Sequence, residues 1–247
     1  MSESSTERLK DMIEASNSIV FLGGAGVSTE SGLPDFRSGD GIFNAIKSYG
    51  YAPETLLSRS FFDSFPEVFF DYYKKALLRT DVLPNAAHFA LARLEKRGKL
   101  ACVITQNIDG LHQKAGSSRV LELHGSIYRN RCMKCRKEYD AKIVAESKGV
   151  PLCECKGIIK PDVVLYEEGL DPEILEKAVS YIKKADMLIV SGTSLSVYPA
   201  AGLTNYYRGG RLVLINKSAT RLDGAADLLI RSPIGETLLK AVPETPE

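Results

Sequence analysis

The stretch of sequence that decides the fold reads Ile19-Val-Phe-Leu-Gly-Gly-Ala-Gly-Val-Ser-Thr-Glu-Ser-Gly-Leu-Pro-Asp-Phe-Arg-Ser38. An apolar run of strand length opens it, and a glycine-rich loop follows at once. This order is typical of dinucleotide-binding α/β folds, in which glycines let backbone N–H groups approach a pyrophosphate. Thr29 takes the place of the third glycine of G-x-G-x-x-G. The loop therefore favours a nucleotide site but not an ordinary hydride-transferring dehydrogenase.

Outside this stretch, apolar runs of strand length alternate with segments of helical period, as expected of a largely parallel sheet. Helices are predicted to begin at a capping box over residues 4–7, to run from about 85 to 97, and to run from Asp171-Pro172 to about 184. Strands are predicted at residues 19–22, 100–105, 120–123, 163–165, 187–190 and 212–215, with a weaker one at 227–230.

Polar or glycine-rich residues follow four of these strands. They are Gly23-Gly-Ala-Gly26, Gln106-Asn107, Gly192-Thr-Ser194 and Asn216-Lys217. Because ligands of open parallel sheets bind outside the carboxyl ends of the strands, these exits are predicted to form one shared site.

An aromatic-rich stretch interrupts the alternation. Seven of the 20 Phe and Tyr residues lie between Phe61 and Tyr73, and Phe61, Phe65, Phe69 and Tyr73 recur at helical spacing. We predict a helical insert that packs its own core on that face; an aromatic ligand pocket is the alternative.

A second interruption, at about residues 126–160, holds four of the five cysteines. Their spacing, Cys132-x2-Cys135-x17-Cys153-x1-Cys155, is close to that of a two-knuckle zinc site, although the second pair is one residue short. Four thiolates leave no open position for water, so the predicted zinc is structural. A redox dithiol and unrelated buried thiols are the alternatives. Cys102 lies in an apolar strand and is predicted to be a core residue.

Composition excludes several classes of protein. The 247 residues carry 32 basic and 31 acidic side chains, a net charge of +1, which disfavours binding to nucleic acid through bulk charge. No apolar run reaches the roughly 20 residues of a membrane span. The first residues lack the pattern of a secretory signal. We therefore expect a cytoplasmic protein that does not bind membranes or nucleic acid directly, and we expect a monomer.

Together these motifs resemble those of the sirtuins, the NAD-dependent protein-lysine deacylases, and in particular the compact bacterial and archaeal members. The resemblance covers about residues 8–242. It rests on residues 24–38 and the cysteine cluster together with Thr105-Gln-Asn-Ile-Asp-Gly-Leu-His112, Leu123-His-Gly125, Lys160-Pro-Asp-Val-Val-Leu-Tyr166, Gly192-Thr-Ser-Leu-Ser-Val-Tyr-Pro-Ala200 and Ile215-Asn216.

The resemblance implies a Rossmann-like NAD-binding domain and a smaller domain built from two insertions. The large domain is expected to comprise residues 1–37, 86–124 and 161–247. Residues 38–85 form the expected helical insertion, and residues 125–160 form the zinc-binding one. NAD and an acyl-lysine peptide are expected to enter the cleft between the domains from different sides.

The resemblance also implies the residues that bind NAD. Gly24, Ala25, Gly26 and Thr29 are expected at the pyrophosphate, and Phe36 and Arg37 over the ribose. Gln106, Ile108 and Asp109 are expected at the nicotinamide, and Gly192, Thr193, Ser194, Asn216 and Ile234 at the adenosine half. Asp35 and Asp109 have loop capping as their alternative role.

The implied reaction consumes NAD. The acyl oxygen attacks C1′ of the nicotinamide ribose, nicotinamide leaves, and the acyl group ends on ADP-ribose. His124 is the expected general base and Asn107 orients a water or a ribose hydroxyl, whereas His88 is expected at the surface or in packing and His112 as a loop brace. A mono-ADP-ribosyltransferase, an NAD hydrolase and a non-enzymatic NAD-sensing or zinc-dependent binding module are the rivals.

Substrate peptides of the family bind as an added strand, which implies contacts from Val164, Leu165, Tyr166, Ser196 and Val197. Sirtuins commonly have glycine at the position of Glu167, so this residue is a departure. Two acidic residues, Glu167 and Glu168, favour substrates with basic flanks. The Tyr-x-x-Arg pair of desuccinylating members is absent, which predicts removal of acetyl and longer apolar acyl groups.

Overall fold

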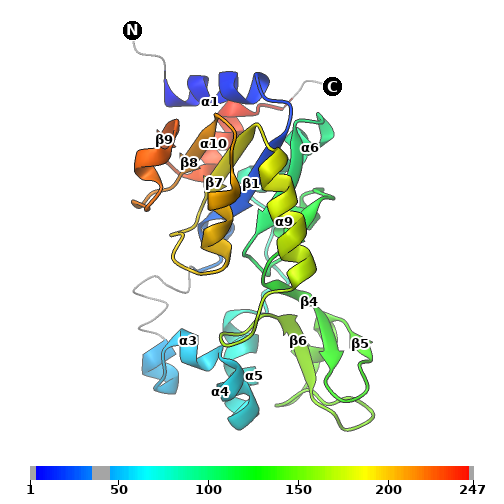
Figure 1. The fold of residues 1–247 in the computed structure, drawn as a ribbon. Helices are drawn as coiled ribbons and strands as arrows, with labels where there is room; N and C mark the ends of the chain where they lie inside the picture. The colour runs from blue at the N-terminus through cyan, green and yellow to red at the C-terminus, as the bar shows by residue number, and fades with distance from the viewer. Residues whose placement is uncertain (1–3, 35–44, 245–247) are drawn as a thin grey trace.

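The computed structural model describes residues 4–34 and 45–244, and it divides into two bodies (Figure 1). The large body is built on a six-stranded parallel sheet with the strand order β3-β2-β1-β7-β8-β9. The strands are β1 (Ile19–Gly23), β2 (Leu100–Thr105), β3 (Val120–Glu122), β7 (Met187–Ser191), β8 (Leu212–Ile215) and β9 (Leu228–Ile230). From β1 the chain first adds β2 and β3 on one side. It then crosses to the other side of β1 and adds β7, β8 and β9.

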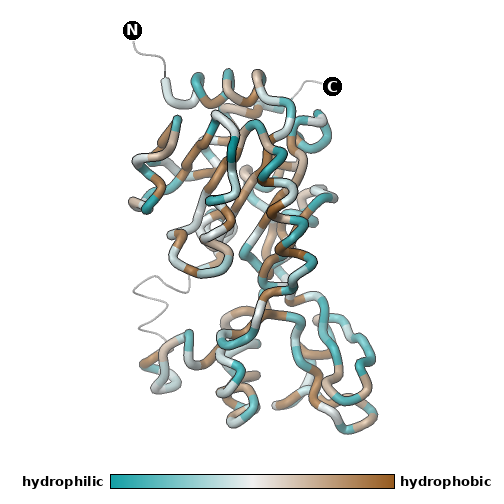
Figure 2. Tube along the Cα trace, viewed as in Figure 1, coloured by the Kyte–Doolittle hydropathy of each residue, from teal (hydrophilic) through white to brown (hydrophobic). Residues whose placement is uncertain are grey.

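Helices cover both faces of this sheet because its strands are apolar on both sides. On one face, α1 (Ser5–Glu14), α6 (Ala86–Lys96) and α10 (Ile234–Ala241) pack on a layer that includes Ile19 and Phe21. On the other, α9 (Pro172–Lys184) packs on a layer that includes Val20 and Leu22. Neighbouring residues of β1 thus serve opposite layers, as the alternation of a strand requires. Figure 2 shows the resulting apolar centre of the large body.

The helix ends follow from local sequence. Ser4 and Glu7 form the predicted capping box of α1, Asn85 caps α6, and Asp171 caps α9 with a proline in the first turn. Each cap supplies an acceptor for backbone N–H groups that have no partner within the helix. These predicted boundaries are confirmed to within one residue.

The second body, called here the insert body, combines two segments that are distant in sequence. The first gives α3 (Pro53–Leu56), α4 (Arg59–Ser64) and α5 (Pro66–Ala76). The second gives α8 (Ala141–Glu146) and an antiparallel sheet, β5-β4-β6, from β4 (Gly125–Cys132), β5 (Glu138–Tyr139) and β6 (Ile159–Val163). Phe69 and Tyr73 of α5 share one core with Ile127 and Ile159 of the sheet, so the two segments fold as one unit.

The structure of the insert body differs from the predictions in three ways. The strand placed at residues 163–165 is β6, which ends at Val163 and pairs with β4 rather than joining the parallel sheet. The strand β4 was not predicted, because its residues are mostly polar or basic. Pro66 starts a new helix after Phe65, so the aromatic residues do not share one helical face, and Phe65 is 51% exposed.

The prediction of an aromatic core in the helical segment is otherwise confirmed. Phe61, Phe69 and Tyr73 are buried, and the rings of Phe69 and Tyr73 stack with centroids 5.8 Å apart. Two helices of the described chain thus supply this core instead of one. Among the residues that the structure describes, none lies in a helix that is both long enough and apolar enough to span a membrane.

The short α7 (Leu111–Lys114) follows the exit of β2 and holds His112 in the interior of the large body. His88, on α6, is also fully buried, and its ring lies 4.7 Å from that of His112, centroid to centroid. Burial lowers the pKa of His88 to about 4 and that of His112 to about 3, so both rings are neutral. The expectation of a packing role for His88 is confirmed.

Candidate functional site

The strand exits meet at a cleft of about 560 Å³ between the large body and the insert body. Three of the four predicted exits contribute to its lining. Of the predicted site residues, those that line it are Gly24, Ala25, Gln106, Asn107, Ile108, Asp109, His124, Val164, Leu165, Tyr166, Gly192, Thr193, Ser194 and Val197. One shared site at the carboxyl edge of the sheet is therefore present.

Two glycines of the first loop allow that loop to pack against the exit of β7. A Cβ on Gly24 would lie 2.8 Å from the carbonyl oxygen of Gly192, and one on Gly26 would lie 2.7 Å from the Cα of Gly192. The N–H groups of Gly24 and Gly26 donate to Ser191 and Gly192 at 3.2 and 2.9 Å. These two amides are engaged within the protein, so their glycines hold the two loops together rather than presenting those N–H groups to a pyrophosphate.

Side chains connect the other exits across the same edge. Gln106 Nε2 donates to Thr193 Oγ1 at 3.1 Å. Asn216 receives the N–H of Thr193 at 3.3 Å and donates to its carbonyl oxygen at 3.1 Å. Asn216 does not itself line the cleft, but it fixes the backbone of a residue that does.

A hydrogen-bonded network of Ser28, Asn107 and Asp109 lies in the floor of the cleft. Ser28 Oγ donates to Asp109 Oδ2 at 2.7 Å and accepts from Asn107 Nδ2 at 2.9 Å. Asp109 Oδ1 accepts from the N–H of Leu111 at 2.9 Å, which is the loop-capping role left open above. Ser28 is 2% exposed and was not singled out as a site residue. Its signal was only its place in the glycine-rich loop.

His124 lies where β3 gives way to β4. Its Nδ1 is 2.9 Å from the carbonyl oxygen of Gln106. A carbonyl oxygen only accepts, so Nδ1 carries the proton of this bond, and in the neutral ring Nε2 is the basic nitrogen. Gly125, next in the chain, has φ of 77°, and a Cβ there would overlap the carbonyl oxygen of Asp162. Only glycine fits after His124.

Several predicted residues are not brought to the cleft wall. Among the described residues, Gly26, Thr29, Ser196, Asn216 and Ile234 do not line it. Thr29 Oγ1 caps its own loop by donating to Gly26 at 3.0 Å, and Ile234 is buried in the core of the large body. Phe36 and Arg37, like Asp35, lie outside the described residues. The structure adds Leu33, Pro53, Leu57, Ala76 and Leu77 to the lining, an apolar set that no motif announced.

The four clustered cysteines converge at one end of the insert body. Their sulfurs all lie within 4.8 Å of one another, with 3.5 Å between Cys132 and Cys155 and between Cys135 and Cys153. Zinc–sulfur bonds of about 2.3 Å place tetrahedral thiolates about 3.8 Å apart. The hydroxyl of Tyr139 donates to Cys153 and lowers the pKa of that thiol to about 6. The cysteines are positioned to bind a structural zinc, while Cys102 is buried in the sheet and burial raises its pKa to about 12.

The two cysteine hairpins explain the shortened second pair. In the first, Cys132 donates its N–H to Lys137, and Arg136 has a φ of 65°. In the second, Cys153 donates its N–H to Gly157, and Lys156 has a φ of 62°. Each hairpin has its left-handed residue directly after the second cysteine, but the second hairpin closes one residue sooner. The missing residue therefore tightens a turn and still delivers a sulfur to the cluster.

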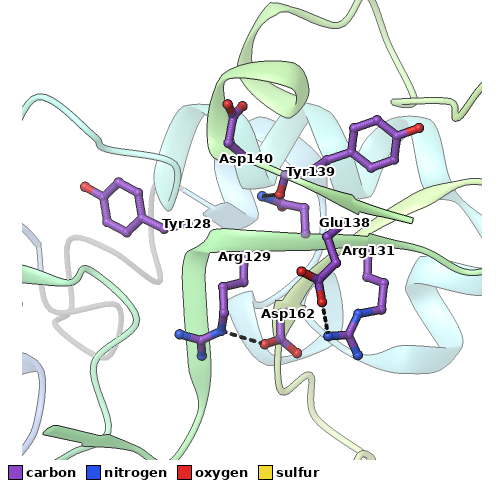
Figure 3. Close-up of a pocket in the computed structure, with 8 residues that line it drawn as sticks. Tyr128, Arg129, Arg131, Glu138, Tyr139, Asp140 and Asp162 are labelled. Carbon is purple, nitrogen blue, oxygen red and sulfur yellow. Dashed lines mark hydrogen bonds and ion pairs between the residues drawn. The ribbon is translucent and has the colours of Figure 1, made fainter. Parts of the chain in front are cut away.

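A second hollow, of about 310 Å³, lies on the sheet of the insert body (Figure 3). Four of its five charged side chains are paired with one another, Arg129 with Asp162 at 3.0 Å and Arg131 with Glu138 at 2.7 Å, and the fifth, Asp140, caps α8. None of these residues lines the larger cleft. The larger cleft, which the strand exits and His124 share, is the candidate functional site.

Comparison with known proteins gives a consistent result. The model of the Sir2 family matches residues 24–199. A protein of Clostridium perfringens named NAD-dependent protein deacetylase is 58% identical over 237 residues, which cover 95% of this chain and 97% of the relative. A protein of Clostridium acetobutylicum with the same name is 55% identical, over 93% of this chain and 95% of the relative.

Solved structures agree with these relatives. A Sir2 homologue in complex with NAD is similar with a TM-score of 0.87 and 39% identity, over 96% of this chain and 92% of that one. A Sir2 variant with a deacetylated p53 peptide and 3′-O-acetyl-ADP-ribose is similar with a TM-score of 0.87 and 38% identity, over 95% of this chain and 96% of that one.

Proposed function

The chain belongs to the Sir2 family, and on this premise we propose that its cleft removes acyl groups from protein lysines and transfers them to ADP-ribose, with release of nicotinamide. The chain is thus an NAD-dependent protein deacetylase. The observation that carries the assignment to this cleft is the position of His124, beside Asn107 and Asp109 at the edge where the strand exits meet.

We propose that His124 is the general base. Its Nδ1–H is held by the carbonyl oxygen of Gln106, which fixes the tautomer and leaves Nε2 to accept a proton from a ribose hydroxyl. The positive charge that then develops on the ring is stabilised by the same carbonyl dipole.

We propose that the network of Ser28, Asn107 and Asp109 orients the nicotinamide end of NAD. Each oxygen of Asp109 already accepts one bond, and a carboxylate has about four acceptor positions, so it can also receive the nicotinamide amide. The hydrogen bond to Ser28 fixes the amide of Asn107 and prevents it from rotating about its last side-chain bond. A water or ribose hydroxyl beside it therefore meets a fixed group.

The remaining NAD contacts are proposed by motif. We assign Ala25, Thr29, Phe36 and Arg37 to the pyrophosphate and its ribose, with Gln106 and Ile108 at the nicotinamide. Thr193, Ser194, Asn216 and Ile234 are assigned to the adenosine half. Ile234 begins α10, where Gly235 donates its N–H to Glu30 at 2.9 Å.

Acyl-lysine peptides are proposed to bind between residues 164–166 and residues 196–197. The cleft there is apolar, and no Lys or Arg lines it among the residues described. An acyl carboxylate would find no fixed cation, whereas an acetyl or longer alkyl group would contact Leu57, Ile108 and Leu77. We therefore propose a preference for acetyl over succinyl groups.

Charge beside the proposed groove comes from one of its two neighbouring glutamates. Glu168 is paired with Lys160 at 3.1 Å and with Arg59 at 3.2 Å, so its charge is compensated. Within the described part of the chain, Glu167 accepts hydrogen bonds from Ser60 but forms no ion pair. The proposed preference for basic residues near the acyl-lysine therefore rests on Glu167.

We also propose the division into a large domain of residues 1–37, 86–124 and 161–247 with insertions at 38–85 and 125–160. The exceptions are β6, whose residues to Val163 pair with β4, and residues 164–167 after it, which belong with the insert body. A monomer in the cytoplasm is proposed as well. The five cysteines are free thiols in the structure, a state that suits a reducing compartment.

The function is tested by incubating the protein with NAD and an acetyl-lysine peptide and measuring nicotinamide and 2′-O-acetyl-ADP-ribose by mass. We expect both products in equal amounts, and a loss of about 100-fold or more in kcat for His124→Ala. Lys177→Ala, on the exposed side of α9, is the control. Nicotinamide formed without peptide would indicate an NAD hydrolase instead, and faster turnover of succinyl-lysine would contradict the proposed acyl preference.

A further inference from the structure

Glu167 has a backbone conformation that is unusual for its type. Its φ is 76°, in the left-handed region that L-residues other than Asn and Asp seldom adopt. Most of the other described residues in this region are glycines. A glutamate here costs free energy that a glycine would not, so its side chain is expected to make a compensating interaction.

That interaction is with the first turn of α4, in the other segment of the insert body. Both oxygens of Glu167 are used: one accepts from the N–H of Ser60 and the other from its Oγ, each at 2.9 Å. The N–H of Ser60 belongs to the helix start, where it has no acceptor within the helix. Glu167 thus caps a helix that begins more than 100 residues earlier in the chain.

The neighbouring amides of α4 are satisfied in a related way. Arg59 donates its N–H to the carbonyl oxygen of Tyr166 at 3.0 Å, and Tyr166 donates its own to Leu57 at 3.0 Å. Ser58 Oγ caps the N–H of Phe61 at 3.2 Å. Two of the first three N–H groups of α4 are therefore satisfied by residues 166 and 167.

The segment that provides these caps also forms one wall of the cleft. Two residues before Tyr166, Val164 donates its N–H to the carbonyl oxygen of His124 at 3.0 Å. The segment is thereby tied to His124 at one end and to α4 at the other. A shift of α4 would move Leu165 and Tyr166 relative to His124.

We propose that Glu167 is a positioning residue that clasps α4 to residues 164–166 and so holds the acyl-lysine wall of the cleft at a fixed distance from His124. The proposal rests on the proposed function of the cleft. It explains how a glutamate is accommodated at a left-handed position: two hydrogen bonds to Ser60 offset the cost of its backbone conformation.

The test compares Glu167→Ala, Glu167→Gln and Ser60→Ala by steady-state kinetics with an acetyl-lysine peptide that has neutral flanks. Glu167→Ala is expected to raise the peptide KM about fivefold, which corresponds to the loss of about one net hydrogen bond, with kcat and the KM for NAD within about twofold of wild type. Glu167→Gln keeps an acceptor for the N–H of Ser60 and an amide for its Oγ, and is expected to restore the peptide KM.

Ser60→Ala removes one of the two donors. It is expected to raise the peptide KM about twofold in the wild type and not at all in the Glu167→Ala background, because the clasp is already absent there. Glu173→Gln, an exposed glutamate of α9, is the matched control. An unchanged KM in Glu167→Ala, or a Gln variant as impaired as the Ala variant, would overturn the proposal.

Amide hydrogen exchange gives a readout that needs no turnover. In Glu167→Ala, the amides of residues 59–61 are expected to exchange about fivefold faster, while those of β1 are unchanged. If the wild type does not deacetylate the peptide, the proposed function fails, and exchange still decides whether the clasp exists. Unchanged exchange at residues 59–61 would refute the clasp even in an active enzyme.

Discussion

The sheet of the large body and the sheet of the insert body are stabilised in different ways. The first has six parallel strands between two layers of helices, and its central strands β1 and β7 are buried along their whole length. The second has three antiparallel strands, and one end of it carries the cysteine cluster. A metal bound by the cysteines would crosslink the insert body in addition to its apolar core, whereas the large body depends on apolar burial.

The functional cleft lies between these two bodies, which assigns them separate tasks. The large body supplies the strand exits at residues 24–25, 106–109 and 192–194, and the insert body supplies residues 53–57, 76–77 and 164–166. Damage to the large body should therefore remove both NAD and peptide binding. Damage to the insert body should affect the peptide first.

The largest expected effect is removal of zinc, because structural zinc contributes about 10–16 kcal/mol in isolated zinc-finger peptides. Chelation, or Cys135→Ser, is expected to unfold the insert body and to lower kcat/KM for the peptide more than 100-fold, while the large body keeps its circular dichroism signal. Cys102→Ala, a cysteine outside the cluster, is the control. Full activity in protein shown by metal analysis to lack zinc would contradict the structural role.

A pair of core truncations compares the two bodies directly. Leu91→Ala in the large body and Phe69→Ala in the insert body each remove a fully buried side chain and are expected to cost about 3–5 kcal/mol. Urea unfolding measures the total loss of unfolding free energy, and hydrogen exchange shows which body is destabilised. We expect Phe69→Ala to raise the peptide KM with little change in NAD affinity. Equal losses of NAD affinity in both variants would show that the bodies do not act separately.

Acid should destabilise the large body through its two buried histidines. Their pKa values in the folded state, about 4 for His88 and about 3 for His112, lie below the unfolded value of about 6.5. As pH falls below 6.5 the unfolded chain binds protons that the folded chain does not, so stability is lost. At pH 5 each histidine accounts for about 2 kcal/mol.

The measurement is urea unfolding of the wild type and of His112→Leu at pH 7, 6 and 5. The variant is expected to lose about 2 kcal/mol less than the wild type between pH 7 and pH 5, since one site of linked protonation is gone. Identical pH slopes would mean that His112 is protonated in the folded protein.

The smallest expected effect is that of charge beside the peptide. Because Glu167 is exposed, its attraction for a basic residue is worth less than about 1 kcal/mol, or about two- to threefold in the peptide KM. Peptides with lysine flanks are expected to bind better than peptides with aspartate flanks, and added salt should reduce the difference. The same preference in Glu167→Gln would assign it to other residues.

Predictions succeeded where one physical signal dominated. The bounds of strands β2 and β8 were predicted correctly because both strands are largely buried on both faces and almost wholly apolar. Helix starts at Ser4, Asn85 and Asp171 followed from their capping side chains. The strand β4 was not predicted because its buried residues do not alternate regularly and include the polar Ser126 and Asn130. The helix break at Phe65 was not predicted because the aromatic residues on both sides of it keep helical spacing, although Pro66 starts a new helix.

At the site, the sequence correctly predicted the residues of the strand exits but not all of their roles. Glycine was expected to make room for a pyrophosphate, whereas Gly24 and Gly26 make room for Gly192. Ser28 was passed over because a serine in a loop has no distinctive pattern, although it links Asn107 to Asp109.

The sequence by itself determined the parallel sheet, the family and the cysteine ligands, because burial, motif order and metal spacing are local properties of the chain. Only the tertiary structure decided which nitrogen of His124 is the base, since Gln106 is distant in sequence and supplies the defining carbonyl. It also decided what Glu167 does. The position looked like a departure from a glycine, and its partner, Ser60, lies 107 residues away. Contacts of this kind depend on how the two inserted segments pack, and no local pattern encodes that.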